Sequence, residues 1–213
     1  MKALTRSFLA CAAALAVALP AAAQVGKNLT GILDPNLATK EQLVTVPNVT
    51  PALADAIIKG RPYLDMLALD KVVAPVVAEA PRKDTYAKLF IPINLNTATR
   101  PEIMLVPGMG NRMAHEFEEY RPYKALAQFD REIGKYVSKE EVARFGQYVF
   151  VPMDLNTASD ADFLTIPGLG NRMLREFKEY RPYQNIEQFR REIGKYVSKD
   201  EVARLERYVT LNK

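Results

Sequence analysis

Histidine, cysteine and tryptophan are scarce in this sequence: its 213 residues contain one histidine, one cysteine and no tryptophan. A metal site with several histidine or cysteine ligands is excluded, and so is a disulfide framework, because each requires at least two such side chains. Nucleophilic catalysis assisted by histidine would depend on His115 alone. No set of acid, base and nucleophile stands out. We therefore expect no catalytic residues, no bound metal and no cofactor.

The cysteine lies in an N-terminal segment that is typical of an export signal. Lys2 and Arg6 precede an apolar run over residues 8–19, and Ala21-Ala22-Ala23 follows. This order of charge, short apolar run and small residues predicts a signal peptide over residues 1–23, cleaved after Ala23. The alternative is an uncleaved membrane anchor, for which the run is short. We expect a periplasmic or secreted protein without thiols and without stable membrane insertion after cleavage.

The rest of the chain repeats a unit of about 60 residues three times. Residues 95–149 align with 155–209 without a gap, and more than half of the positions are identical. A diverged copy precedes them, since the Arg-Pro-Tyr at 121–123 and 181–183 also occurs at 61–63. Such periodicity defines the architecture. We divide the chain into unit 1 (24–92), unit 2 (93–152) and unit 3 (153–213).

The pattern within each unit predicts four helices and no strand. Serine or threonine three residues before Glu, Gln or Asp is typical of the residue that caps a helix. This spacing begins the first helix at Thr39, Thr99 and Ser159, with Asp162 as the imperfect partner, and the fourth helix at Ser138 and Ser198. In unit 1, Pro75 and Pro81 interrupt the helical pattern. The predicted fold class is all-α.

A tight turn joins the first two predicted helices of units 2 and 3. Its sequence is Pro-Gly-Met-Gly-Asn-Arg at 107–112 and Pro-Gly-Leu-Gly-Asn-Arg at 167–172. We call these segments the glycine turns. Together with the upstream Asn-Thr-Ala at 96–98 and 156–158, they resemble the helix-hairpin-helix module. The whole unit resembles the tandem, SAM-like helical domain of the ComEA competence DNA receptor family. That resemblance implies sequence-independent binding to the DNA backbone, as in DNA uptake, with uptake or secretion proteins as further partners.

The residue types in the glycine turns suit a phosphate ligand. Glycine lets a backbone approach closely, and the N-terminus of a new helix offers free N–H groups with a partial positive charge. An arginine two residues after the second glycine can pair with the same phosphate or the next one. The candidate DNA-binding residues are Gly108, Met109, Gly110, Asn111, Arg112, Gly168, Leu169, Gly170, Asn171 and Arg172. Met109 and Leu169 are also expected to fill the core beneath each turn.

A second turn in each unit departs from the family pattern. Tyr-Val-Ser at 136–138 and 196–198 replaces Gly-hydrophobic-Gly, so only point charges remain for phosphate. The candidate secondary contacts are Lys135, Lys139, Lys195 and Lys199. Unit 1 departs further, because Asn48-Val49-Thr50 and Ala52 stand where units 2 and 3 have the glycine turn and its arginine. We expect unit 1 to be a structural or partner-binding copy.

The charge balance supports a different interpretation. Lys and Arg exceed Asp and Glu by 29 to 25 in the chain, but by only 8 to 8 in unit 2 and 11 to 10 in unit 3. A protein that binds DNA through counterion release usually has a clear basic excess. A periplasmic protein–protein interaction module without DNA binding is therefore the alternative.

The tyrosines of Arg-Pro-Tyr could stack on bases, but we expect them to lie in the core. We expect His115 to be exposed.

Overall fold

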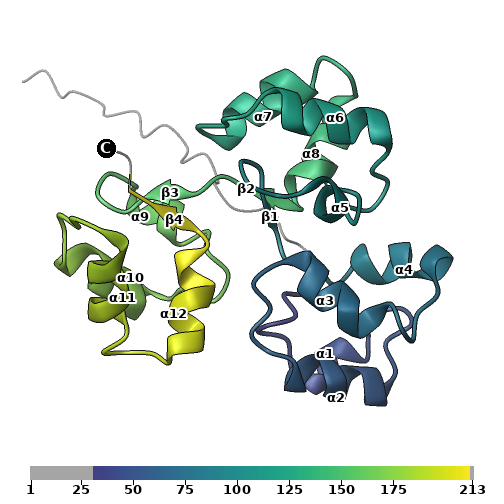
Figure 1. Cartoon of the computed structure of the whole chain (residues 1–213), viewed down its shortest axis with the longest axis horizontal. Helices are drawn as coiled ribbons and strands as arrows, with labels where there is room; N and C mark the ends of the chain where they lie inside the picture. The colour runs from purple at the N-terminus through teal and green to yellow at the C-terminus, as the bar shows by residue number, and fades with distance from the viewer. Residues whose placement is uncertain (1–30, 212–213) are drawn as a thin grey trace, which may run out of the picture.

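The computed structural model describes residues 31–211, so the predicted signal peptide lies outside the described residues. The described part of the chain is mostly helical, with twelve helices and four strands of two residues each. The helices form three groups around the strands, with α1–α4, α5–α8 and α9–α12 visible as separate clusters (Figure 1).

The helices and strands recur in a fixed order. Unit 1 contains α1 (Lys40–Leu43), α2 (Pro51–Lys59), α3 (Met66–Val73) and α4 (Glu79–Tyr86). Unit 2 contains β1 (Ile93–Asn94), α5 (Arg100–Ile103), α6 (Asn111–Glu119), α7 (Leu126–Ile133), α8 (Lys139–Gly146) and β2 (Val149–Phe150). Unit 3 contains β3 (Met153–Asp154), α9 (Asp160–Phe163), α10 (Asn171–Glu179), α11 (Ile186–Ile193), α12 (Lys199–Glu206) and β4 (Val209–Thr210).

Most of the predicted helix starts are confirmed by their caps. Ser138 and Ser198 accept from the backbone N–H three residues on, and α8 and α12 follow them. A complete capping box is present at Thr39 and also at Ser159, where Asp162 serves as well as a longer acid. Thr99 makes no side-chain cap. The local pattern is therefore a good guide to where helices begin, although α5 begins after Thr99 without this hydrogen bond.

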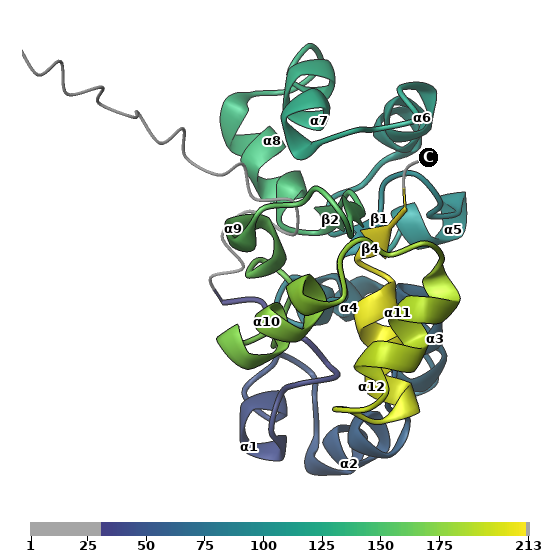
Figure 2. The same cartoon turned by 90° about the vertical axis from the view of Figure 1, so that its left-hand side faces the viewer.

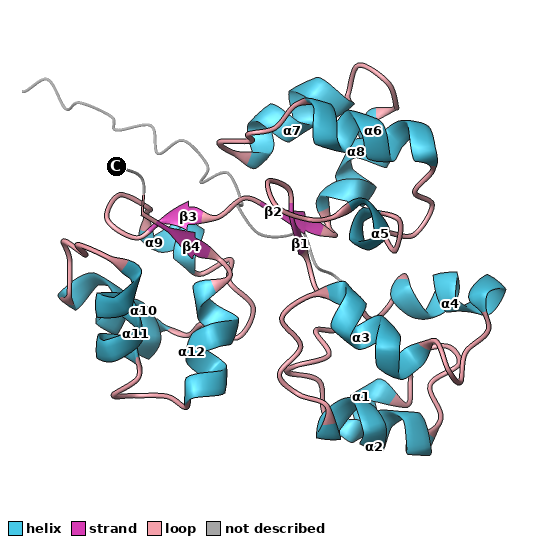
Figure 3. Cartoon of the chain, in the orientation of Figure 1, coloured by secondary structure: helices cyan, strands magenta, loops and turns pink. Residues whose placement is uncertain are grey.

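The prediction of no strand was wrong. In unit 2, β1 pairs in parallel with β2 (Ile93 with Val149), and in unit 3 β3 pairs in parallel with β4 (Met153 with Val209). Unit 1 has a single parallel bridge, Leu33 with Leu89. The pairs join the beginning of each unit to its end (Figure 3). Segments of two residues are too short to show the alternation that identifies a strand in a sequence.

The expected interruption in unit 1 was also wrong at one point. Helix α4 begins at Glu79 and contains Pro81 as its third residue. The N–H groups of the first helical turn have no partner within the helix, so a proline there removes no bond. Unit 1 consequently has the same four helices as the other units.

The buried side chains form two clusters. The cores of units 1 and 2 are continuous with one another, whereas Phe150 belongs to the cluster formed with unit 3. In unit 2, Phe117 on α6 packs edge-on against Phe129 at 5.0 Å and Phe145 at 5.5 Å between ring centroids. These contacts anchor the helix that follows the glycine turn to the other helices of its unit.

Unit 1 contacts both of the other units. The Glu102 carboxylate of unit 2 accepts a hydrogen bond from the backbone N–H of Met66, the first residue of α3, at 3.2 Å. From unit 3, the Arg207 guanidinium donates to the Pro92 carbonyl at the end of unit 1 at 2.9 Å. Figure 2 shows the three groups of helices from the side, with α1–α4 lying next to both others.

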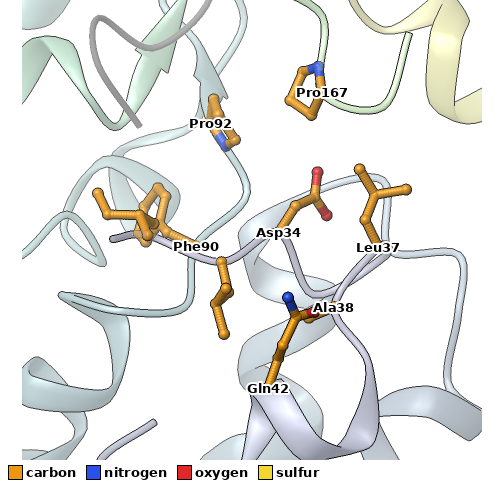
Figure 4. A pocket seen from close by; sticks show the side chains of 9 residues that line it. Asp34, Leu37, Ala38, Gln42, Phe90, Pro92 and Pro167 are labelled. Carbon is orange, nitrogen blue, oxygen red and sulfur yellow. The ribbon is translucent and has the colours of Figure 1, made fainter. Parts of the chain in front are cut away.

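A carboxylate lies where unit 1 meets unit 3. Asp34 lines a cavity of about 320 Å³ together with Leu37 and Pro167, and Figure 4 shows these three side chains around the same space. Its Oδ1 accepts from the Asn36 backbone, whereas Oδ2 has no hydrogen-bond partner among the described residues. Burial raises the pKa of Asp34, against the opposing effect of the Asn36 bond and of Arg204 and Arg207.

We expect Asp34→Asn to stabilise the protein at pH 7. Because the pKa of Asp34 in the folded protein is raised, stability falls as pH rises from the unfolded value of about 4 through the folded value. Asparagine keeps the side-chain acceptor for the Asn36 N–H, as Asn94 does at the same position of unit 2. An unpaired buried polar group lowers the free energy of unfolding by about 1 kcal/mol or more. Urea unfolding should show that gain at pH 7 and none below pH ~3.5. A loss of stability at pH 7 would mean that the arginines hold the ionised carboxylate.

Candidate nucleic-acid interface

All three units form the same backbone turn after their first helix. The turn has a positive φ at Gly108 (76°) and Gly168 (75°), and at Asn48 (64°) in unit 1. The next residue donates its N–H to the carbonyl three residues earlier, as Met109 does to Val106 at 3.0 Å. Glycine is the residue best suited to this conformation, and asparagine is among the few others that adopt it.

An arginine on the last helix of the unit holds the carbonyl of each glycine turn. Arg204 on α12 donates to the Pro167 carbonyl at 2.7 Å and is only 2 % exposed, while Glu201 accepts two further bonds from it. Arg144 on α8 makes the same contact with Pro107. In unit 1 the Thr85 hydroxyl donates to the Pro47 carbonyl at 2.9 Å instead. Both arginines hold the turn from within their own unit, but Arg204 is buried, whereas the side chain of Arg144 is 32 % exposed.

The contact between these arginines and the turn carbonyls was not predicted, although one sequence pattern involves the same arginines. Glu141 with Arg144, and Glu201 with Arg204, lie three residues apart on α8 and α12. That spacing alone predicts an ordinary surface ion pair on a helix. The carbonyl that each arginine binds lies 37 residues earlier in the chain, and nothing local indicates it.

The helices that leave the glycine turns have no side-chain cap. Gly110 and Gly170 are the N-cap residues of α6 and α10 and offer no side chain to their N–H groups. In unit 1 the Thr50 hydroxyl takes this role and accepts from the Leu53 N–H of α2 at 3.2 Å. A side-chain acceptor therefore occupies the N-terminus of the second helix in unit 1. In units 2 and 3 the N–H groups at this N-terminus are open to solvent or to a ligand.

The space in front of these N-termini is open. Gly108, Gly110, Asn111 and Arg112 are exposed, and so are their counterparts Gly168, Gly170, Asn171 and Arg172. A Cβ placed on Gly110 or Gly170 would have no atom within 4 Å. The predicted core role of the middle residue is confirmed, because Leu169 is 7 % exposed and Met109 packs against the core of its unit.

Both arginines of the glycine turns keep their charge uncompensated. Neither Arg112 nor Arg172 forms an ion pair within the described part of the chain. The guanidinium of Arg112 lies 5.9 Å from the centroid of the Tyr136 ring, which belongs to the second turn of unit 2. An exposed arginine in the first turn of a helix whose first N–H groups are uncapped can bind an anion together with them.

The lysines of the second turns fall into two classes. Lys135 and Lys195 form ion pairs with Glu132 and Glu192, so their charges are compensated. Lys139 and Lys199 are exposed at the starts of α8 and α12 and form no ion pair within residues 31–211. The second pair is therefore the better candidate for a phosphate contact.

A tyrosine pair brings the two turns of unit 2 together. The hydroxyls of Tyr120 and Tyr136 lie 2.6 Å apart, and the hydrogen bond between them raises the pKa of Tyr136. Lys135 Nζ lies 5.0 Å above the Tyr120 ring, so Arg112 and Lys135 contact the same pair. In unit 3, Tyr180 and Tyr196 repeat the hydroxyl contact at 2.8 Å.

The Asn-Thr-Ala and Arg-Pro-Tyr motifs bind each other rather than a ligand. Asn96 donates to the Tyr123 carbonyl at 2.9 Å and accepts from its N–H at 2.6 Å. Arg121 donates to the carbonyls of Leu95 and Ala98, and the peptide bond that follows it is cis. Tyr123 is 2 % exposed, which confirms its predicted place in the core. These motifs therefore hold each unit together and leave its turns free.

Other candidate sites are not supported in residues 31–211. His115 is exposed, as expected, and lies 3.9 Å from Glu119. These residues contain no cluster of histidine, cysteine and acidic side chains suited to a metal ion. No helix in the same range is long and apolar enough to span a bilayer. Comparison of the chain with protein-family models, curated proteins and solved structures finds no match.

Proposed function

We propose that this chain is an exported, non-sequence-specific DNA-binding protein made of three tandem helix-hairpin-helix units of the ComEA type. In this proposal it acts as a binding protein rather than an enzyme, in DNA uptake outside the inner membrane. Its ligand is the phosphate backbone, which reaches the N-termini of α6 and α10. Arg112 and Arg172 supply the charge, with Lys139 and Lys199 as secondary contacts.

The observation that carries the proposal is the contrast among the three copies of one turn. In units 2 and 3 the helix after the turn has a glycine N-cap, no side-chain cap and an unpaired arginine. In unit 1 the equivalent helix is capped by Thr50 and has Ala52 in place of the arginine. Backbone N–H groups and arginine recognise phosphate without reading bases. Units 2 and 3 are thus expected to bind, and unit 1 is not.

Salt dependence tests the proposal directly. Two turns that each contact about two phosphates should give a slope of about −3 to −4 for log K against log salt, from roughly −0.9 per phosphate. Binding should be micromolar or weaker at physiological salt and equal for duplexes of unrelated sequence. Fluorescence anisotropy of a labelled duplex, titrated with residues 24–213 in a salt series, measures both.

The interaction module without DNA binding is the second candidate. It is favoured by the near-equal numbers of basic and acidic residues in units 2 and 3. Absence of any duplex binding at about 50 mM salt, where electrostatic contacts are screened weakly, would transfer our preference to it.

A further inference from the structure

We infer that the cleft between units 2 and 3 binds a small phosphate monoester that carries an apolar ring, of the class of the nucleoside monophosphates. Lys124 and Arg207 supply the positive charge of this site, and the side-chain amide of Asn94 supplies a neutral donor. The cleft is lined by none of the residues of the glycine turns. The inference therefore does not depend on the proposed DNA binding.

The first observation is the cleft itself. Its volume is about 680 Å³, within the range of roughly 300 to 1,000 Å³ that small-molecule sites occupy. It lies next to β1 of unit 2 and β4 of unit 3, whose neighbouring positions Figure 2 shows. Lys124 of unit 2 and Arg207 of unit 3 both line it, and the lining contains no aspartate or glutamate. Two units thus contribute one cation each to a space without acidic side chains.

The second observation is that the charge of this cleft departs from the 60-residue repeat. Three of its lining residues are more positive, or less negative, than the residues at the same position of both other units. They are Asn94 (Asp34 and Asp154), Lys124 (Leu64 and Gln184) and Arg207 (Ala87 and Gln147). The three positions are far apart in the chain and meet in one cleft. All three departures favour an anion there.

The third observation is that Arg207 is held in place by the protein. Its guanidinium donates to the Pro92 carbonyl at 2.9 Å and lies over the rings of Phe150 and Tyr208, at 5.5 and 5.2 Å from their centroids. A guanidinium has five N–H donors, so further donors remain for a ligand. A cation that is already ordered loses little conformational freedom when the ligand binds.

The charge of both cations is available to an anion. Lys124 is exposed and forms no ion pair within residues 31–211. Arg207 opposes the rise in pKa that burial causes in Asp34 and Glu102. It forms an ion pair with neither of them in the described part of the chain. The cleft therefore keeps a positive potential.

Asn94 adds a donor at a position where its counterparts carry a negative charge. Its Oδ1 accepts from the N–H of Asn96 at 2.9 Å, as Oδ1 of Asp154 does from Asn156. The turn therefore tolerates either residue. Asparagine also has an amide nitrogen with two N–H donors, whereas aspartate has none and would repel an anion.

This set of donors suits a phosphate monoester. The group carries nearly two negative charges at pH 7 and has three terminal oxygens, so two cations and an amide can bind it together. A carboxylate offers only one charge and two oxygens. Pro122, Pro152 and Val209 line the same cleft and offer apolar surface to the rest of the ligand. A phosphate joined to a ring therefore fits the cleft better than an isolated ion does.

The probe is adenosine 5′-monophosphate, titrated into the mature chain (residues 24–213) and followed by calorimetry. We expect saturable binding, with adenosine and inorganic phosphate each binding about 10-fold more weakly or less, because each lacks one part of the ligand. Backbone NMR shifts should locate the nucleotide, with changes at Thr97 and Thr210, which line the cleft.

Two variants take their new residues from the other units. Lys124→Gln introduces the residue that unit 3 has at the same position and should weaken nucleotide binding about 10-fold, the effect of losing one hydrogen bond to a charged group. Asn94→Asp keeps the acceptor for Asn96 and should weaken binding at least as much, through repulsion. The matched control is Lys59→Gln, which removes the same charge at an exposed position on α2 and should bind the nucleotide as wild type does.

Duplex binding by the same samples separates this site from the glycine turns. Lys124→Gln should bind duplex as wild type does, and Arg112→Glu/Arg172→Glu should bind the nucleotide as wild type does. A protein that binds the nucleotide but no duplex would support the inference and contradict only the proposed function.

Four results would overturn the inference. The first is the absence of saturable nucleotide binding. The second is equal affinity for the nucleotide and inorganic phosphate, which would remove the role of the ring. The third is loss of nucleotide binding in Arg112→Glu/Arg172→Glu but not in Lys124→Gln, which would place the anion at the glycine turns. The fourth is a parallel loss of duplex binding in Lys124→Gln, which would make the cleft part of a DNA-binding surface.

Discussion

The double variant Arg112→Glu/Arg172→Glu should bind a labelled duplex about 100-fold more weakly than wild type at low salt. Each arginine lies in the first turn of an uncapped helix and forms no ion pair within the described residues. A hydrogen bond to a charged group contributes about 1.5 kcal/mol or more, so the loss of two such bonds corresponds to about two powers of ten. Repulsion by the new carboxylates adds to this loss. Anisotropy titrations at about 50 mM salt measure the change.

Unfolding would not explain such a loss, because both side chains are exposed and glutamate near a helix N-terminus is favourable. The matched control is Lys88→Glu/Lys124→Glu, which changes the net charge by the same amount at exposed positions outside the helices that form no ion pair within residues 31–211. Beyond about 10 Å, charges are largely screened at 0.1 M salt, so the control should lose only a few-fold. Equal losses in the two double variants would mean that only net charge matters, and the mechanism at the glycine turns would be wrong.

The parts of the fold that the sequence predicts are those fixed by local chemistry. Ser138 and Ser159 begin helices because their hydroxyls accept from N–H groups three residues on. The glycine turn is visible in the sequence because Gly108 and Gly168 adopt a positive φ that few residues tolerate. The 60-residue repeat then extends each local inference to the other units. Helix starts and turn positions could therefore be predicted from the amino-acid sequence alone.

The parts that the sequence does not reveal depend on contacts between distant residues. Arg144 and Arg204 look like members of surface ion pairs, yet they bind carbonyls 37 residues earlier. The pairing of β1 with β2 joins the two ends of a unit through two residues each. Glu102 matches a capping box, but it also accepts a hydrogen bond from Met66 of unit 1. In each case the deciding partner lies far away in the chain, so no local pattern could identify it.

The geometry of the two glycine turns was predicted more completely than that of the residues around them. All ten residues proposed for the two glycine turns lie at or beneath exposed turns of the same geometry, which is what the repeated motif required. What the sequence did not show is that Thr50 caps the equivalent helix of unit 1. Nor did it show that Leu37 of unit 1 lies against the turn of unit 3. The capping difference offers a way to test the backbone N–H groups separately from the arginines.

The variant Gly110→Thr/Gly170→Thr should stabilise the protein and weaken DNA binding at the same time. It gives α6 and α10 the cap that α2 has in Thr50, and the side chain has room because nothing lies within 4 Å of a Cβ at either position. The φ angles of Gly110 (−119°) and Gly170 (−96°) suit any residue. Replacing glycine at an N-cap should add a few tenths of a kcal/mol per helix. The threonine hydroxyl then competes with phosphate for the same N–H groups.

We expect binding to fall about 10-fold, with both arginines still present and the net charge unchanged, because the N–H groups of two helices are no longer free. Thermal unfolding and anisotropy on the same samples measure the two effects. The matched control is Thr50→Gly, which uncaps α2 of unit 1 and should destabilise the protein without improving binding, since Ala52 supplies no charge. A capped double variant that binds like wild type would show that the arginines act alone. A gain of binding in Thr50→Gly would show that an open helix N-terminus suffices without them.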